Sequence, residues 1–144
     1  WFVHAELGKK FLKKELTSHQ VNEEMSRALF MTEQDRKELS GLTDIWYGNK
    51  GPILYRGMVL NDEKYNPLHI NVLKKILEAY KVKRIVVGHT IFPDVASFYG
   101  GRVIGVNVNN KENFEKVLGR GMLIEQGNTY VIGDKGIMRS IPYF

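Results

Sequence analysis

Cysteine is absent from the 144-residue sequence. Without cysteine the chain can form neither disulfide bonds nor metal sites built from thiolates, and such a composition fits a reducing compartment such as the cytoplasm. Long hydrophobic runs are absent as well. The longest, around residues 85–87, has the length of a strand and falls far short of the roughly 18 residues that cross a membrane. We therefore expect a cytoplasmic protein without membrane contact.

Charge of one sign is only mildly in excess. The chain has 21 Lys and Arg against 16 Asp and Glu, a net charge of +5, with 43% hydrophobic and 26% charged residues. That balance is ordinary for one soluble domain with its own core. A positive charge would suit RNA, but the lysines recur at helical spacing, and the sequence has no aromatic-glycine motif of the common RNA-binding modules. The composition thus disfavours nucleic acid as a partner.

The spacing of apolar residues predicts a mixed α/β fold. Asn66 followed by Pro67 predicts the start of the clearest helix. Strands are predicted at residues 1–5, 84–88, 95–99, 103–107, 122–126, 129–132 and 137–141, and residues 53–59 are predicted to form a short strand or an extended segment. Helices are predicted at residues 9–16, from Thr17 or Ser18 to about residue 30, at residues 67–80 and at residues 111–118. Residues 33–51 are predicted to form a long loop, or a short helix followed by a loop.

The first residue, Trp1, already lies in a predicted strand. A strand at this position is typical of a domain that has been divided. We expect residues 1–144 to be the C-terminal portion of one domain with an incomplete sheet. An exposed sheet edge would then favour self-association.

Two of the four histidines end apolar strands. His4 stands in F-V-H-A and His89 in I-V-V-G-H-T. Sites in α/β sheets form at the C-terminal ends of strands, and neutral imidazole is a good ligand for zinc, manganese or iron. Either histidine alone could instead be buried and satisfied by the backbone, but two strand-end histidines favour a site. His19 and His69 lie near predicted helix starts, and we expect no direct role for them.

These blocks, taken in order, resemble the C-terminal half of the calcineurin-like metallophosphoesterases, closest to the bacterial and protein serine/threonine phosphatase branch. V-H-A and V-V-G-H-T resemble two ligand blocks of that family. G-P-I-L-Y-R-G at residues 51–57 resembles a G-P-L-W-Y-R-G stretch between them, and S-F-Y-G-G-R-V-I-G-V-N-V at residues 97–108 resembles the segment that follows. The resemblance covers nearly the whole chain and implies half of a β-sandwich flanked by helices.

The resemblance also implies roles. His4 and His89 would bind one of two divalent metal ions (Mn, Fe or Zn) whose bound hydroxide hydrolyses phosphate monoesters, including phosphoserine or phosphothreonine. Arg56 would contact the phosphate of a phosphorylated small molecule or phosphoprotein; without the resemblance it reads equally well as a surface arginine. Tyr55 and Trp46 would be packing residues.

The sequence departs from the family in two ways. Glu6 stands where relatives usually have glycine or aspartate, and the Asp-x-His, Gly-Asp-x-x-Asp-Arg and Gly-Asn-His blocks are missing. We therefore expect the chain to be part of a metal-dependent phosphatase and to be inactive alone.

Two other functions stay open from the sequence. The first is a non-catalytic basic α/β module that binds a phosphate-bearing partner such as RNA through its lysines. The second is a hydrolase of another class with His4 or His89 as general base. This second reading lacks a nucleophile motif, because the chain has no cysteine and no G-x-S-x-G, and no motif surrounds Ser97 or Ser140.

Overall fold

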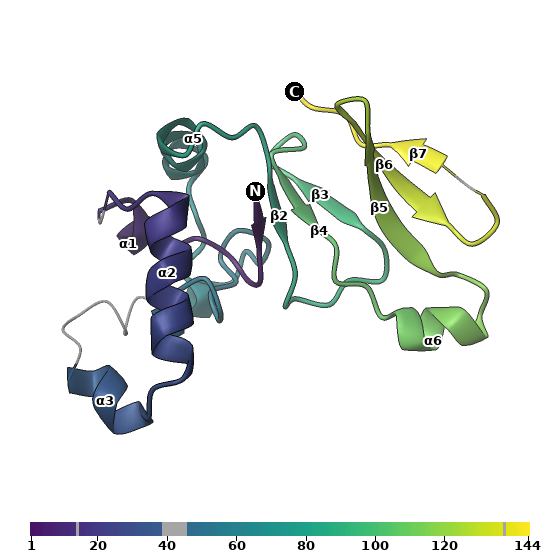
Figure 1. Ribbon diagram of the computed structural model, residues 1–144. Coiled ribbons are helices and arrows are strands. Elements are labelled where there is room, and N and C mark those ends of the chain that lie inside the picture. The colour runs from purple at the N-terminus through teal and green to yellow at the C-terminus, as the bar shows by residue number, and fades with distance from the viewer. Residues whose placement is uncertain (14, 39–45, 137) are drawn as a thin grey trace.

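The computed structural model describes residues 1–13, 15–38, 46–136 and 138–144. It has helices on one side of a four-stranded sheet and a three-stranded sheet on the other (Figure 1). This arrangement confirms the predicted mixed α/β class. No helix in these ranges is long and apolar enough to cross a membrane.

The larger sheet places three parallel strands side by side. Its order is β1 (Phe2–Val3), β2 (Ile85–Val87), β4 (Val103–Gly105) and β3 (Ala96–Phe98), with β3 antiparallel to β4. The smaller sheet is an antiparallel meander of β5 (Arg120–Glu125), β6 (Asn128–Gly133) and β7 (Met138–Ser140). The strands predicted at these seven positions are therefore confirmed. Residue 137, the first residue of the last predicted strand, lies outside the described residues.

The described helices are short except for two. They are α1 (Lys9–Leu12), α2 (Ser18–Leu29), α3 (Glu33–Glu38), the 3₁₀ helix η1 (Glu63–Tyr65), α5 (Ile70–Ala79) and α6 (Asn110–Glu115). Over residues 33–51, where the sequence predicts either a long loop or a short helix followed by a loop, the short helix α3 is present. Residues 39–45 lie outside the described residues.

Alternation along the strands gives the larger sheet two apolar faces. Ile85 and Val87 of β2 pack in a buried cluster with Leu73 and Ile76 of α5. Ile104 of β4 points to the opposite face and joins a second buried cluster with residues of the smaller sheet and its C-terminal extension. Each such side chain contributes about 1.5–3 kcal/mol on burial, so the sheet is held from both sides.

Helix starts follow local hydrogen bonding. Thr17 caps α2 in a capping box with Gln20. The predicted start of the next long helix at Pro67 is wrong: Asn66 ends η1 in a left-handed conformation, and α5 begins at Ile70. The N-cap is His69, whose Nδ1 accepts from the N–H of Asn71 at 3.2 Å. His69 therefore has a structural role at the start of α5, which the sequence analysis did not predict.

The prediction of a short strand or an extended segment at residues 53–59 is also wrong. This segment folds into consecutive turns, in which the carbonyl of Arg56 accepts from the N–H groups of Val59 and Leu60 at 3.3 and 2.9 Å. Glycines at residues 51 and 57 favour such turns over an extended strand. Tyr55 is buried in the core here, as is Trp46 nearby, so both are packing residues as predicted.

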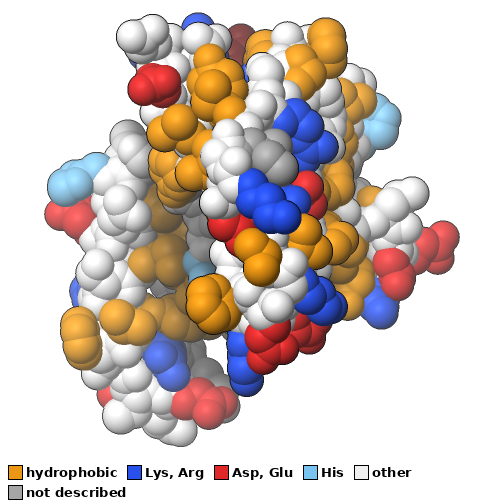
Figure 2. Space-filling model, turned by 90° about the vertical axis from the view of Figure 1, so that its right-hand side faces the viewer, with side chains coloured by type: hydrophobic (Ala, Val, Ile, Leu, Met, Phe, Trp, Pro, Cys, Tyr) orange, Lys and Arg blue, Asp and Glu red, His pale blue; other side chains and the backbone are white. Residues whose placement is uncertain are grey.

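The outer side of the smaller sheet carries charges of both signs. Figure 2 shows hydrophobic side chains there interspersed with Lys and Arg and with Asp and Glu. Exposed apolar residues of its strands include Ile124, Ile132 and Met138. This face therefore presents no continuous basic surface for a nucleic acid.

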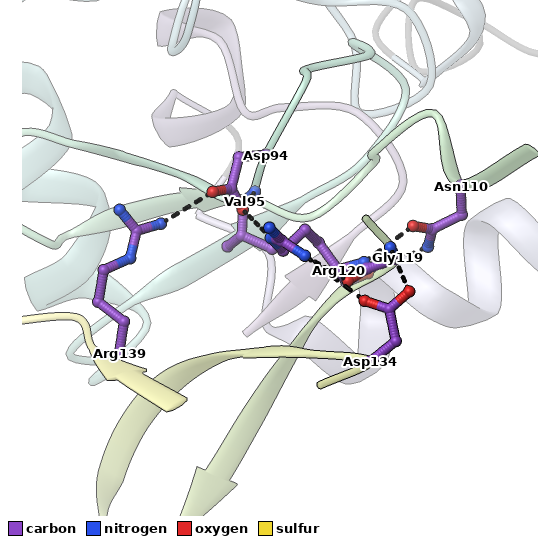
Figure 3. Close-up of polar contacts among 7 residues, drawn as sticks. All are labelled: Asp94, Val95, Asn110, Gly119, Arg120, Asp134 and Arg139. Carbon is purple, nitrogen blue, oxygen red and sulfur yellow. Dashed lines mark hydrogen bonds and ion pairs between the residues drawn. The ribbon is translucent and has the colours of Figure 1, made fainter. Parts of the chain in front are cut away.

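A polar clasp centred on Arg120 joins the smaller sheet to the loop that follows β2 (Figure 3). The Arg120 side chain, which is 21% exposed, lies 3.8 Å from Asp94 and 3.6 Å from Asp134. Its backbone N–H and carbonyl both bond the Asn110 side chain at 3.0 Å. Arg139 adds a second guanidinium to Asp94 at 3.1 Å. The loop that carries Asp94 is thus anchored to a neighbouring layer.

Replacing Arg120 should loosen this anchor. We expect Arg120→Met, which keeps the apolar stem but removes the guanidinium, to lower the free energy of unfolding by about 1–2 kcal/mol. Arg139→Met is the matched control, because it removes a 62% exposed guanidinium from the same Asp94 and should cost less than about 1 kcal/mol. Urea unfolding measures both. Equal losses would show that the clasp is not centred on Arg120.

Candidate functional site

The two strand-end histidines lie side by side. β1 and β2 are parallel, with Phe2 opposite Val86 and Val3 opposite Val87. The ladder continues past the strand ends, where the N–H of Gly88 donates to the carbonyl of His4 at 3.0 Å. The two imidazole rings are consequently 5.1 Å apart between centroids. The structure thus brings together the two residues that the sequence singled out.

The glycine before His89 allows this close approach. A Cβ added to Gly88 would lie 3.0 Å from the carbonyl oxygen of His4, tight enough to push the strand ends apart. His89 then adopts a left-handed conformation with φ 60°, which costs a non-glycine residue about 1 kcal/mol or more. The N–H of Thr90 donates back to the carbonyl of Gly88 at 2.6 Å. A strained backbone at a strand end is a common feature of functional sites.

Arg56 reaches the same place from the turn segment of residues 51–60. Its Nη2 lies 3.1 Å from Nε2 of His89. A guanidinium can only donate, so Nε2 of His89 must be the acceptor in this contact. The proton of the neutral imidazole therefore sits on Nδ1. All three predicted site residues, His4, Arg56 and His89, form one cluster, while their chemical roles stay predictions.

The surroundings keep His89 neutral. Burial lowers the pKa of His89, and its electrostatic interactions with Arg56 and His4 lower it further. The other two histidines lie outside the cluster: His19 is exposed and sits 3.4 Å from Glu23 on the surface of α2, and His69 caps α5. The cluster therefore offers one fixed cation beside a neutral imidazole.

Glu6 is a buried carboxyl group next to this cluster. It is fully buried, and its Oε2 accepts from the backbone N–H of Met58. Its Oε1 has no hydrogen-bond partner among the described residues. Burial raises the pKa of Glu6 to about 7, opposed by the N–H groups of Met58 and Val59 and by the charge of Arg56. Sequence reasoning treated Glu6 as a departure from a motif and, like Asp94, as a carboxylate near the histidines that nothing else marks as a metal bridge; it did not predict that Glu6 is buried.

Asp94, the other carboxylate near the histidines in sequence, does not join the cluster. Its oxygens bond the N–H of Val95 and the guanidinium groups of Arg120 and Arg139. In the described ranges, no group of three or more His, Cys, Asp and Glu side chains is placed to hold a metal ion.

Comparison with solved structures identifies a similar fold. The chain matches the cold-active protein tyrosine phosphatase of the psychrophile Shewanella sp. with a TM-score of 0.81 and 21% identity, over 97% of this chain and 40% of that one. A second structure of a cold-active protein tyrosine phosphatase, at 1.1 Å, matches over 99% of this chain and 39% of that one, with the same score and identity. At this identity the likeness establishes the fold alone.

The chain therefore spans about two fifths of the length of the solved structures that it matches. No family model matches the sequence, and no curated protein does.

This comparison contradicts the predicted calcineurin-like metallophosphoesterase identification, since the similar structures are phosphatases described as protein tyrosine phosphatases. The serine/threonine branch, the metal-bound hydroxide and the pair of Mn, Fe or Zn ions are corrected with it. The physical reason lies in the short motifs. A strand that ends in glycine and histidine presents an imidazole at a sheet edge, and an imidazole serves phosphate binding and proton transfer as well as metal binding.

The buried carboxyl group of Glu6 should make stability depend on pH. Its pKa is near 4.5 when unfolded and about 7 when folded, so the folded state holds the proton more tightly. The resulting stabilisation is fully present below pH 4.5 and is lost as the pH rises through 7. It amounts to roughly 3 kcal/mol.

We expect the difference in unfolding free energy between the native chain and Glu6→Gln to fall by that amount between pH 4 and pH 8, because glutamine has no proton to lose. Urea unfolding at several pH values measures this difference, in which other titrating groups cancel. Glu125→Gln is the matched control, since Glu125 is exposed on β5. A difference that does not change with pH for Glu6→Gln would contradict the perturbed pKa.

Proposed function

We propose that this chain is the phosphate-binding part of a phosphatase that acts on phosphorylated protein side chains, phosphotyrosine in particular. The observation that carries the proposal is the convergence of Arg56, His89 and His4 at the C-terminal ends of β1 and β2. The likeness of the fold to structures described as protein tyrosine phosphatases supports the choice of substrate.

The chemistry of the three side chains suits a phosphate group. The guanidinium of Arg56 can donate two parallel hydrogen bonds to phosphate oxygens while neutralising their charge. Its present partner, Nε2 of His89, is a neutral acceptor and gives way to a charged one at small cost. His4 is exposed on the same edge and can donate a further hydrogen bond.

His89 is also suited to move a proton. Its pKa is lowered by burial and by interactions with Arg56 and His4. The negative charge of a bound phosphate dianion would raise this pKa again. The imidazole can therefore take up a proton when phosphate binds and release it to a leaving oxygen. The chain contains no cysteine, so these residues supply no thiolate, and the proposal for them is limited to phosphate binding and proton transfer.

The RNA-binding alternative gains no support from the structure. The face of the smaller sheet in Figure 2 mixes both charges, and the clustered imidazoles have no counterpart in a purely electrostatic surface. The general-base reading of His4 or His89 survives only as part of the phosphate site.

Arginine substitutions test the proposal. We expect the native chain to bind phenyl phosphate, and Arg56→Met to weaken binding at least about tenfold. Arg56→Lys keeps the charge but loses the two-pronged geometry, so it should fall between the two. Isothermal titration calorimetry at pH 7.5 measures the affinities.

Arg27→Met is the control, because it removes the same charge from the exposed face of α2. If Arg56→Met and Arg27→Met bind equally well, Arg56 has no specific role. Absence of binding by the native chain at millimolar phenyl phosphate would refute the proposal itself.

A further inference from the structure

The turn segment that carries Arg56 cannot place the guanidinium by itself. The carbonyl of Arg56 is bonded within its own turn, by the N–H groups of Val59 and Leu60, and the N–H of Tyr55 bonds the carbonyl of Gly51 at 2.9 Å. These bonds close local turns but do not relate the segment to the histidines. An arginine side chain has several free rotations, which cost free energy to fix. Its direction therefore depends on how the segment is tied to the sheet.

Two hydrogen bonds tie the turn segment to the residues after β1. The N–H of Ala5 donates to the carbonyl of Pro52 at 2.8 Å. The carboxyl group of Glu6 accepts from the N–H of Met58, two residues beyond Arg56. One bond thus lies on each side of Arg56, and both come from the chain immediately after His4.

We propose that Glu6 is a positioning residue for Arg56: its carboxyl oxygen holds the Met58 amide and so sets the turn from which Arg56 reaches His89 and a bound phosphate. This inference rests on the proposed phosphate-binding function of the same site. In this proposal Glu6 acts through the turn, by its hydrogen bond to the Met58 amide.

The surroundings of Glu6 support this role. The titratable groups that interact with its carboxyl group electrostatically are Arg56, Tyr55 and Tyr99. The two tyrosine hydroxyls are engaged elsewhere, since Tyr55 donates to the carbonyl of Asn66 and Tyr99 to that of Leu68, each at 2.7 Å. Arg56 is the cation among the three, so the carboxyl group also attracts the residue whose turn it holds.

The hydrogen bond between Glu6 and Met58 also lies in a closely packed environment. Glu6 is fully buried, and a Cβ on Gly57, between Arg56 and Met58, would lie 2.6 Å from the carbonyl oxygen of Asn66. This position of the turn therefore has no room for a side chain, and its backbone packs directly against the residue that ends η1. A buried acceptor that loses its partner costs about 1–3 kcal/mol, which is enough to select one arrangement of the turn.

Three substitutions of Glu6 separate the effect of side-chain length from the effect of the carboxylate charge. Glu6→Gln keeps the length and one acceptor oxygen but removes the charge. Glu6→Asp keeps the charge and shortens the reach, and Glu6→Met keeps the approximate volume and removes the acceptor. Binding of sulfate, whose charge is constant near neutral pH, is measured by calorimetry on the full 144-residue chain. Thermal melts establish that each variant folds.

We expect Glu6→Gln to bind sulfate within about twofold of the native chain, and Glu6→Asp and Glu6→Met to bind about tenfold more weakly, because misplacing a binding group by about 1 Å is costly. The Nε–H resonance of Arg56 in a proton–nitrogen NMR spectrum, assigned by its loss in Arg56→Lys, should shift in the two weak variants but not in Glu6→Gln. The Arg27 resonance is the internal control. If Glu6→Met does not fold, the sulfate affinity and the Arg56 resonance of Glu6→Asp provide the test.

Native affinity and an unmoved Arg56 resonance in Glu6→Asp would overturn the positioning role while leaving the phosphate site intact. If the native chain binds no sulfate and no phenyl phosphate, the proposed function fails. An Arg56 resonance that still follows the length of residue 6 would then support the positioning role independently.

Discussion

The parallel pairing of β1 with β2 is the constraint on which the candidate site depends. β1 has only two residues, yet hydrogen bonds fix its register at both ends. The amino group of Trp1 donates to the carbonyl of Arg84 at 2.9 Å, and the N–H of Gly88 donates to that of His4 at 3.0 Å. Because parallel strands end at the same sheet edge, this pairing places both imidazoles together. β2 is buried throughout, so it serves as a rigid reference for β1.

The buried Glu6 shows how an irregular segment can be held as firmly as a strand. A carboxyl group that is removed from water destabilises its charged form, which is why the pKa of Glu6 rises to about 7. In return, Glu6 satisfies a backbone N–H that turn geometry leaves unpaired. Proteins accept such local costs where a site must be positioned. The burial of the charged Glu6 carboxylate therefore lowers the stability of the fold, and the same residue orients the side chain of Arg56.

Sequence reasoning found the elements whose signals are local. The apolar run of β2 and the alternation in β5 and β6 were visible, as was the strand-end position of His4 and His89. It failed at Pro67, because Asn66, the expected N-cap, instead ends η1 in a left-handed conformation, and His69 caps α5. It failed again at residues 53–59, where turns override apolar content. The burial of Glu6 depends on segments far apart in the chain, so the residues around Glu6 in the sequence could not reveal it. The metal prediction relied on histidines, whose chemistry is not unique to metal binding.

The contact between Arg56 and His89 argues physically for an anion in this site. The lone pair on Nε2 of His89 is the one that a metal ion would need, and it already accepts a hydrogen bond from Arg56. A cation placed there would have to displace a guanidinium and remain beside its charge, which at close range is repulsive by several kcal/mol in a partly buried setting. An anion meets the opposite situation, since it gains a charged donor and relieves the lowered pKa of His89. The same geometry therefore opposes a cation and attracts a phosphate.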